Sequence, residues 1–148
     1  MRAVSLHTIA LLTLTACGFT QAQADTKGEI RVGQTLPYSG PLSGFGAIGR
    51  VQEVYFEKVN AEGGINGRKV KFISMDDAYS PPKTVEHTRK LVEQDEVQVM
   101  FGSLGTATNN AVHRYLNGKK IPQILVLSGA TKWAGPKNFP YTMPGMAA

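Results

Sequence analysis

The chain has 148 residues, of which 42% are hydrophobic and 18% charged, the composition of an ordinary globular protein and the length of one domain rather than two. Its formal charge of +5 comes from lysines and arginines that alternate with acidic residues. Because no basic block with interleaved aromatic residues occurs, the charge pattern argues against nucleic-acid binding. Cys17 is the single cysteine, so an internal disulfide is excluded.

Residues 1–24 have the order of regions found in a secretory signal peptide. Arg2 precedes an apolar stretch over 4–16, and the small-x-small pattern Ala22-Gln23-Ala24 follows. We expect cleavage after Ala24, so that the mature chain starts at Asp25 and is periplasmic. The apolar stretch is shorter than the ~20 residues that a membrane-spanning helix needs.

A second processing site competes with the first. Leu14-Thr15-Ala16-Cys17 resembles the lipobox of bacterial lipoproteins, in which the cysteine is lipidated and starts the mature chain. The alternative is therefore a periplasmic lipoprotein that is anchored through Cys17.

After the leader, strand and helix patterns alternate along the chain. Apolar and alternating runs predict strands over 30–36, 69–75, 97–101, 123–127 and, shorter, 141–143. Helical spacing predicts helices over 47–62, from Pro81 with Ser80 as its cap, and over 106–116. This alternation predicts an α/β fold, a parallel sheet with helices on both faces.

Two further expectations concern the helices themselves. Ile48, Val51, Tyr55, Val59 and Glu62, widened by Val54, mark the expected inner face of the first helix. Gly63-Gly64 and Asn117-Gly118 are expected to stop the first and third helices.

The stretch 97–116 is the candidate for ligand binding. It is typical of a strand, a glycine turn and a helix, whose first turn contains Thr106 and Thr108. Unpaired backbone N–H groups and hydroxyls would gather there, beyond the carboxyl end of a strand, where a small anion can bind. The competing interpretation is a structural N-cap in an ordinary βα unit.

Ligands of parallel α/β sheets bind beyond the carboxyl ends of the strands. In this chain the loops at that edge are 38–46, 76–80, 102–106 and 128–131, and all four contain polar or aromatic residues.

Gly44-x-Gly46-x-x-Gly49 has the spacing of a dinucleotide-binding fingerprint and suggests an oxidoreductase as an alternative. The fingerprint requires its first glycine at the end of the strand, whereas 37–43 intervene here. The acidic pair Asp76-Asp77 also lies farther along the chain than the fingerprint's usual ~20 residues.

Other reactive side chains form no catalytic pattern. His87 and His113 have no metal-ligating partner at i+4 and are expected to be surface or structural histidines. Asp76 and Asp77 are adjacent on a strand, so they point to opposite faces, and we expect one of them to cap or brace a loop. Catalysis has no positive support in the sequence.

Four segments resemble the amino-terminal lobe of type I periplasmic binding proteins, and most closely the leucine/isoleucine/valine-binding family of ABC transporters. They are Tyr38-Ser39-Gly40-Pro41, the run 59–68 (VNAEGGINGR), Asp76-Asp77 and the turn 101–106 (FGSLGT). The run 59–68 is the specific part. The resemblance covers Ile30 to about Met143 in the family's order and spacing.

The resemblance implies two α/β lobes that close on an amino acid or small carboxylate, which is then delivered to an ABC permease in the inner membrane. It implies a solute-binding protein rather than an enzyme, with no cofactor and no metal. In this family the first lobe holds the ligand's carboxylate and ammonium. Carried over, the ligand-binding residues are Tyr38, Ser103, Gly105, Thr106, Thr108, Ser128, Gly129, Ala130 and Thr131; Tyr79 and Trp133 are placed less securely.

Family members are more than twice as long as this chain, which stops after the expected strand 141–143. We therefore expect residues 25–148 to form a partial amino-terminal lobe, without the second lobe. Three functions stay open: a solute-binding component, whole or truncated; a dinucleotide-binding oxidoreductase fragment; and an inert fragment without a ligand.

Overall fold

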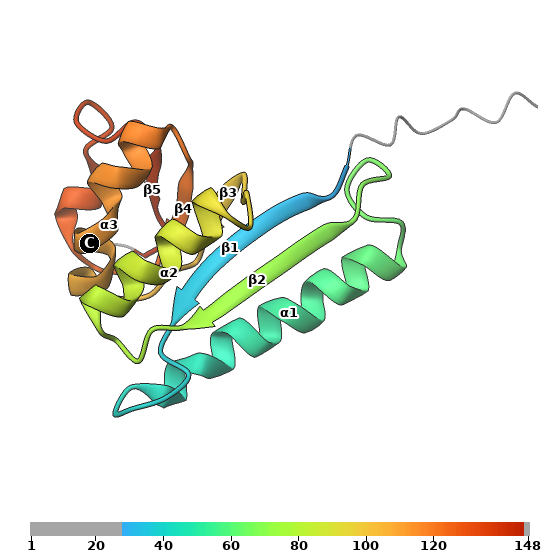
Figure 1. The fold of residues 1–148 in the computed structure, drawn as a ribbon, viewed down its shortest axis with the longest axis horizontal. Coiled ribbons are helices and arrows are strands. Elements are labelled where there is room, and N and C mark those ends of the chain that lie inside the picture. Colours follow the sequence, from blue (N-terminus) through green and yellow to red (C-terminus); the bar gives the residue numbers. More distant parts are fainter. Residues whose placement is uncertain (1–27, 147–148) are drawn as a thin grey trace, which may run out of the picture.

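The computed structural model describes residues 28–146 and places them in one parallel sheet with helices on both faces (Figure 1). The predicted signal peptide and the predicted lipidation site at Cys17 lie outside the described residues. The strands are β1 (Ile30–Leu36), β2 (Val70–Asp76), β3 (Val99–Phe101), β4 (Gln123–Val126) and β5 (Thr142–Pro144). Their order in the sheet is β2-β1-β3-β4-β5, and neighbouring strands are parallel. The predicted fold class is confirmed.

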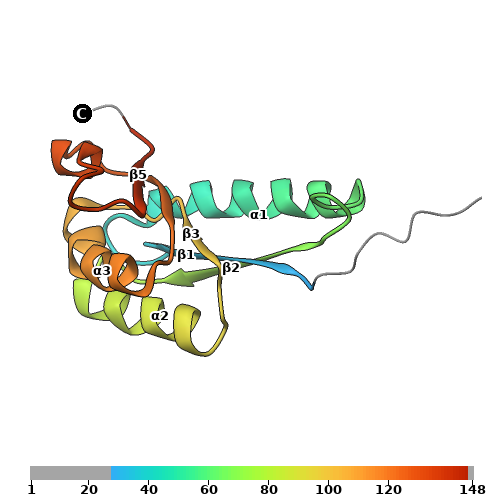
Figure 2. The ribbon, with the colours of Figure 1, turned by 90° about the horizontal axis from the view of Figure 1, so that it is seen from above.

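The three α-helices are α1 (Gly46–Ala61), α2 (Pro81–Glu93) and α3 (Thr106–Lys119), with short 3-10 turns η1 (Ser43–Phe45) and η2 (Thr131–Ala134). Figure 2 shows α1 on one side of the sheet and α2 and α3 on the other. None of the helices within 28–146 is long and apolar enough to cross a membrane.

The apolar core lies between the sheet and the α2–α3 pair. Leu91, Val97, Met100, Val112 and Leu116 form one buried cluster there. This burial fixes α3 against β3, so the turn that joins them is anchored at both ends.

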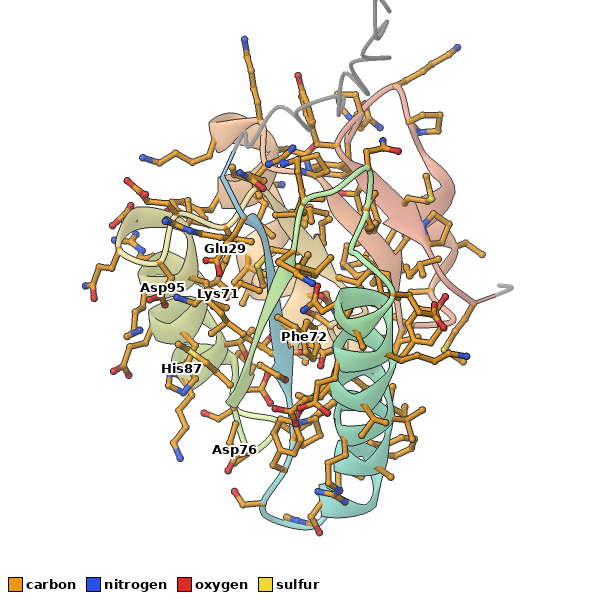
Figure 3. All side chains as sticks on the ribbon, turned by 90° about the vertical axis from the view of Figure 1, so that its right-hand side faces the viewer. Glu29, Lys71, Phe72, Asp76, His87 and Asp95 are labelled. Atoms are coloured by element: carbon orange, nitrogen blue, oxygen red, sulfur yellow. The ribbon has the colours of Figure 1, made fainter. Side chains whose placement is uncertain are left out.

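The other face is packed differently, because α1 lies on β1 and β2 with a partly polar contact surface. Gln52 accepts a hydrogen bond of 2.6 Å from Nε2 of the fully buried Gln34, whose Oε1 accepts one of 2.9 Å from Ser74. Phe56 packs on Phe72, at 5.1 Å between ring centroids, and reaches Phe101 of β3 at 5.7 Å. Figure 3 shows Phe72 on the side of β2 that faces α1.

The expected inner face of α1 is therefore only partly right. Ile48 and Val59 are half-buried. Val51, Val54 and Tyr55 are 69%, 63% and 61% exposed, and Glu62 lies outside the helix as its C-cap. The helix instead turns Gly49, Gln52 and Phe56 to the sheet. Apolar spacing misled the prediction at the exposed positions because glycines, a glutamine and an aromatic ring supply much of the contact surface.

The third helix also departs from expectation. It runs through Asn117-Gly118 to Lys119, and Lys120 ends it in the left-handed conformation at φ 58°. Asn117 is held inside the helix by hydrogen bonds of its side-chain amide to the carbonyl of His113 and to Thr142 Oγ1. Tertiary contacts thus outweigh the turn preference of Asn-Gly.

Smaller differences concern the ends of the elements. The strand expected over 97–101 is regular only over 99–101, and Ser80 precedes α2 without a side-chain capping bond. The 30–36 strand is confirmed at both ends.

Candidate functional site

The turn between β3 and α3 is shaped by two glycines in conformations that other residues avoid. Gly102 has φ 64° and Gly105 has φ 108°. A Cβ atom added to Gly105 would lie 2.4 Å from Cε2 of Tyr79 and 2.5 Å from Oγ1 of Thr108. Only glycine fits here, and the backbone therefore passes close under the Tyr79 ring.

The first turn of α3 is open to a ligand. Its N-cap residue, Gly105, has no side chain to satisfy the first N–H groups, and no side-chain cap is formed. The N–H groups of Thr106, Ala107 and Thr108 therefore point out of the helix end, where helix geometry gives them no carbonyl partner. Together with the helix dipole they favour a negative charge.

Two hydroxyls stand beside these donors. Thr106 Oγ1 and Ser128 Oγ are 2.7 Å apart, and they come from the turns after β3 and β4. Ser128 Oγ accepts hydrogen bonds from Trp133 Nε1 at 2.8 Å and from Ala130 N at 3.4 Å. Since these donors occupy its lone pairs, the Ser128 hydroxyl proton remains available for Thr106 or for a ligand.

Two other predicted side chains are turned inward. Ser103 Oγ accepts a hydrogen bond of 3.2 Å from Thr35 N, and Thr108 Oγ1 donates one of 2.5 Å to the Leu104 carbonyl. Ser103 and Thr108 are 3% and 1% exposed. Their side chains hold the turn in place, which leaves backbone groups for ligand contact.

The loop after β4 supplies the remaining predicted residues. Gly129 and Thr131 are exposed, and Ala130 is half-buried. The Ala130 carbonyl accepts a hydrogen bond of 3.3 Å from Trp133 N. Trp133 itself is 1% exposed, and its Nε1–H donates to Ser128, so it supports Ser128 rather than adding a side chain to the candidate site.

The structure does not bring the Tyr38 side chain to this group. Its hydroxyl is 2.6 Å from Ser74 Oγ, and its ring lies against Gly46 and Gly49 of α1. A Cβ atom on Gly49 would overlap the Tyr38 hydroxyl, at 1.9 Å. Two glycines of the G-x-G-x-x-G pattern thus make room for Tyr38.

Tyr79 takes the position of an aromatic wall beside the helix end. It and Ala78 both have positive φ, 60° and 48°, which is strained for residues with a side chain. Asp77 Oδ1 holds the Tyr79 amide at 2.9 Å. The sequence indicated only that the loop 76–80 lies at the carboxyl edge of the sheet. No sequence pattern predicted the left-handed backbone that places the Tyr79 ring over Gly105.

The acidic pair braces this loop, as expected. Asp76 Oδ1 accepts hydrogen bonds from the amides of Tyr38, Ser39 and Ala78 at 2.8, 3.1 and 3.0 Å. Burial acts to raise the pKa of Asp76, but these bonds and the Ser39 side chain outweigh it and lower the pKa to about 2. Asp77 Oδ2 accepts from Thr84 Oγ1 at 2.8 Å, and burial raises the pKa of Asp77.

Within the described part of the chain, no group of three or more His, Cys, Asp or Glu side chains could hold a metal ion. At the start of α3, N–H and O–H donors lie together, which is the arrangement that anion sites at helix N-termini use, and the Tyr79 ring borders them.

Residues 29–147 match the family described as periplasmic binding protein. The chain belongs to this family. Its sheet and helices form the lobe of a type I periplasmic binding protein, and the resemblance to the leucine/isoleucine/valine-binding group is confirmed. The family and the fold are those of solute-binding proteins.

One curated relative of this periplasmic binding protein is "Leu/Ile/Val-binding protein homolog 7" of Brucella abortus (strain 2308). It is 29% identical over 97 residues, which cover 65% of this chain and 24% of the relative. This chain therefore spans about a quarter of the length of that relative.

Two solved structures of binding proteins are similar to this chain in both sequence and fold. A substrate-binding periplasmic protein from Ralstonia solanacearum is 28% identical with a TM-score of 0.71, over 78% of this chain and 33% of its own. A solute-binding protein of an R. palustris ABC transporter, in complex with benzoate, is 36% identical with a TM-score of 0.59, over 70% of this chain and 28% of its own.

Proposed function

We propose that this chain is the amino-terminal ligand-binding lobe of an ABC uptake system for branched-chain amino acids or related small carboxylates. The observation that carries the proposal is the Thr106–Ser128 hydroxyl pair at 2.7 Å beside the uncapped first turn of α3. A carboxylate seated there receives N–H and O–H donors together, and charge-assisted hydrogen bonds are the stronger ones.

The proposal also places the side chain and the ammonium group of the ligand. The Tyr79 ring over Gly105 offers an apolar face to an aliphatic or aromatic group. Backbone carbonyls near Gly129 and Ala130 can accept from an ammonium group, because a carbonyl oxygen has two lone pairs. Ser103, Gly105 and Thr108 act through the backbone, and Thr131 lies at the rim. In this proposal the chain is periplasmic, starts at Asp25 or, alternatively, at a lipidated Cys17, and passes its ligand to an inner-membrane permease.

The proposal is tested by calorimetry and NMR titration of the full chain with leucine, with benzoate and, for the oxidoreductase alternative, with NAD. In a form of the protein that also carries a second lobe, Thr106→Ala removes one hydroxyl donor to the enclosed carboxylate and should weaken binding by about 1 to 3 kcal/mol, the range for a hydrogen bond to a charged group. The peptide amides of 105–109 should shift most in the NMR spectra.

Glu62→Ala is the matched control, because Glu62 is exposed at the far end of α1 and, among residues 28–146, forms its one ion pair with Lys58, at 3.8 Å. It should leave the affinity unchanged. Equal losses at Thr106 and Glu62, or saturable binding of NAD instead, would contradict the proposal.

A further inference from the structure

A second polar hollow lies along α3, separate from its N-terminus. Its volume is about 410 Å³, and it is lined by Asn110, His113, Arg114, Lys132 and Phe139. The residues come from the second and third turns of α3, from η2 and from the loop before β5. No part of the candidate ligand site described above lines it.

The charge in this hollow has one sign. Arg114 and Lys132 are both exposed, and no acidic side chain lines the hollow. Among residues 28–146, no carboxylate forms an ion pair with either of them. The Lys132 ammonium instead contacts Asn110 Oδ1 and lies 4.6 Å from the centroid of the Trp133 ring. Two cations thus converge with only neutral partners.

His113 adds a third group that can carry positive charge. Its Nδ1 is 3.0 Å from the Asn110 carbonyl oxygen; a carbonyl only accepts, so Nδ1 carries the proton and Nε2 is where a second proton binds. The ring is fixed edge-on against Phe139 and Trp133, at centroid distances of 4.4 and 5.4 Å. Burial lowers the pKa of His113; the hydrogen bond to Asn110 opposes this, and the charges of Lys132 and Arg114 add to the lowering.

We propose that this hollow is a binding site for a small oxyanion, a sulfate, phosphate or carboxylate group, held by Arg114 and Lys132 with the amide of Asn110. The guanidinium presents N–H donors in a fork that matches two oxygens of such a group, and the ammonium adds a point charge. An anion here removes the mutual repulsion of the cations. It also links α3 to η2, the turn that carries the Trp133 support of Ser128.

Anion binding and protonation of His113 assist each other. A bound anion counters the charges of Lys132 and Arg114, so it raises the pKa of His113 toward its ordinary value. By linkage, the anion binds more tightly below that pKa than above it.

The test is an NMR titration of the full chain with sodium sulfate, at constant ionic strength set with sodium chloride. The charge of sulfate does not change over the pH range of the titration, so any pH dependence of binding comes from the protein. We expect saturable shifts at 110–114 and 132, tighter binding at about pH 5.5 than at about pH 7.5, and a rise in the pKa of His113 on saturation.

Arg114→Gln and Lys132→Gln should each weaken sulfate binding about fivefold, as expected for an exposed charge pair. Lys83→Gln, which removes an exposed charge from α2, is the matched control and should change nothing. Thr106→Ala should leave the sulfate-induced shifts at 110–114 and 132 intact, which separates this site from the proposed ligand site.

Three results would overturn the proposal. They are the absence of saturable shifts at 110–114 and 132, an equal loss in Lys83→Gln, and loss of those same shifts in Thr106→Ala. Inorganic phosphate and acetate, titrated in parallel, then show whether a phosphoryl or a carboxyl group is preferred.

Discussion

Asp76 shows how a single side chain shapes the edge of the sheet where the candidate site lies. It stands at the end of β2 (Figure 3) and binds three amides from two loops. Its hydrogen bonds fix the chain on both sides of Tyr38 and set up the left-handed pair Ala78-Tyr79. The position of the ring over Gly105 therefore depends on a carboxylate that lies outside the candidate site.

Asp76→Asn should destabilise the fold by about 1 kcal/mol at neutral pH, because it removes the charge that strengthens these hydrogen bonds. The pKa of Asp76 is about 2 in the folded chain and about 3.9 when unfolded. This contribution is therefore complete above the unfolded value and is lost as the pH falls toward the folded one. Urea unfolding of both forms at several pH values measures it.

The difference between the two proteins should shrink as the pH falls from about 4 to about 2. Glu86→Gln, on the exposed side of α2, serves as the control and should change the unfolding free energy by less than about 0.5 kcal/mol. A difference that grows on acidification would show that Asp76 is not held as a charged acceptor.

Residue by residue, the sequence located the site's turn but not the direction of each side chain. Thr106 and Ser128 meet as their loop positions suggested. Ser103 and Thr108 face inward because buried backbone groups take their hydroxyls. Tyr38 faces α1 because its hydroxyl pairs with Ser74 of β2 and its ring packs on Gly46 and Gly49. Loop position predicts which edge a residue occupies, whereas those competing partners decide where its hydroxyl points.

At the scale of elements, α1 and α3 deviate from their sequence patterns for opposite reasons. In α1 an apolar stripe, Val51, Val54 and Tyr55, stays exposed while Gln52 is bound to Gln34. In α3 the dipeptide Asn117-Gly118, which is typical of turns, lies within the helix. The spacing of strands and helices predicted where the elements lie, but packing decided which face and which end.

Gln52→Ala should destabilise the fold by about 0.5 to 1.5 kcal/mol, because it removes one of the three acceptors of the buried Gln34 amide, which keeps the carbonyls of Phe101 and Gly102. Val54→Glu should cost less than about 0.5 kcal/mol, since this side chain is largely exposed. Urea denaturation compares the two, and a larger loss for Val54 would restore the apolar stripe as the inner face.

Gly118→Ala should stabilise the protein by about 0.5 to 1 kcal/mol, because alanine loses less entropy than glycine in a helix interior. A Cβ atom at position 118 meets nothing within 4 Å. Gly105→Ala is the contrasting change and should be destabilising, since Gly105 combines a φ of 108° with close contacts. Thermal melts monitored by circular dichroism measure both changes. A lower melting temperature for Gly118→Ala would show that the helix stops at this residue.

At the scale of the whole molecule, the described residues enclose the candidate site from one side. Its donors come from the turns after β3 and β4, and the chain spans about a quarter of the length of its Brucella relative. On the α1 side of the sheet, an apolar groove of about 560 Å³ lies against β4 and β5, with Ile124 and Met143 in its lining. The sequence could predict the lobe, because strand and helix patterns are local features of the chain. It could not predict which parts of the lobe's surface are buried against other parts of a protein.

The full chain should bind leucine or benzoate only at millimolar concentration or weaker, about 4 kcal/mol less favourably than a micromolar receptor. The reason is that ligand pockets bury most of a small ligand's surface, whereas Thr106 and Ser128 must here compete with water. Calorimetry at high protein concentration measures this affinity. Micromolar binding by the monomeric chain would mean that the single lobe is a complete binding module.

The hydrogen-bonded contact of α1 with the sheet sets the order in which the molecule comes apart. The α2–α3 side is closed by an apolar cluster, whereas α1 is attached through Gln34, Gln52 and a few aromatic contacts. Local opening follows the fewest buried apolar contacts. The helix that carries two of the G-x-G-x-x-G glycines should therefore detach as a unit and exchange its amide hydrogens early, while β3 and the amino end of α3 stay folded and keep the donors of the candidate site in place.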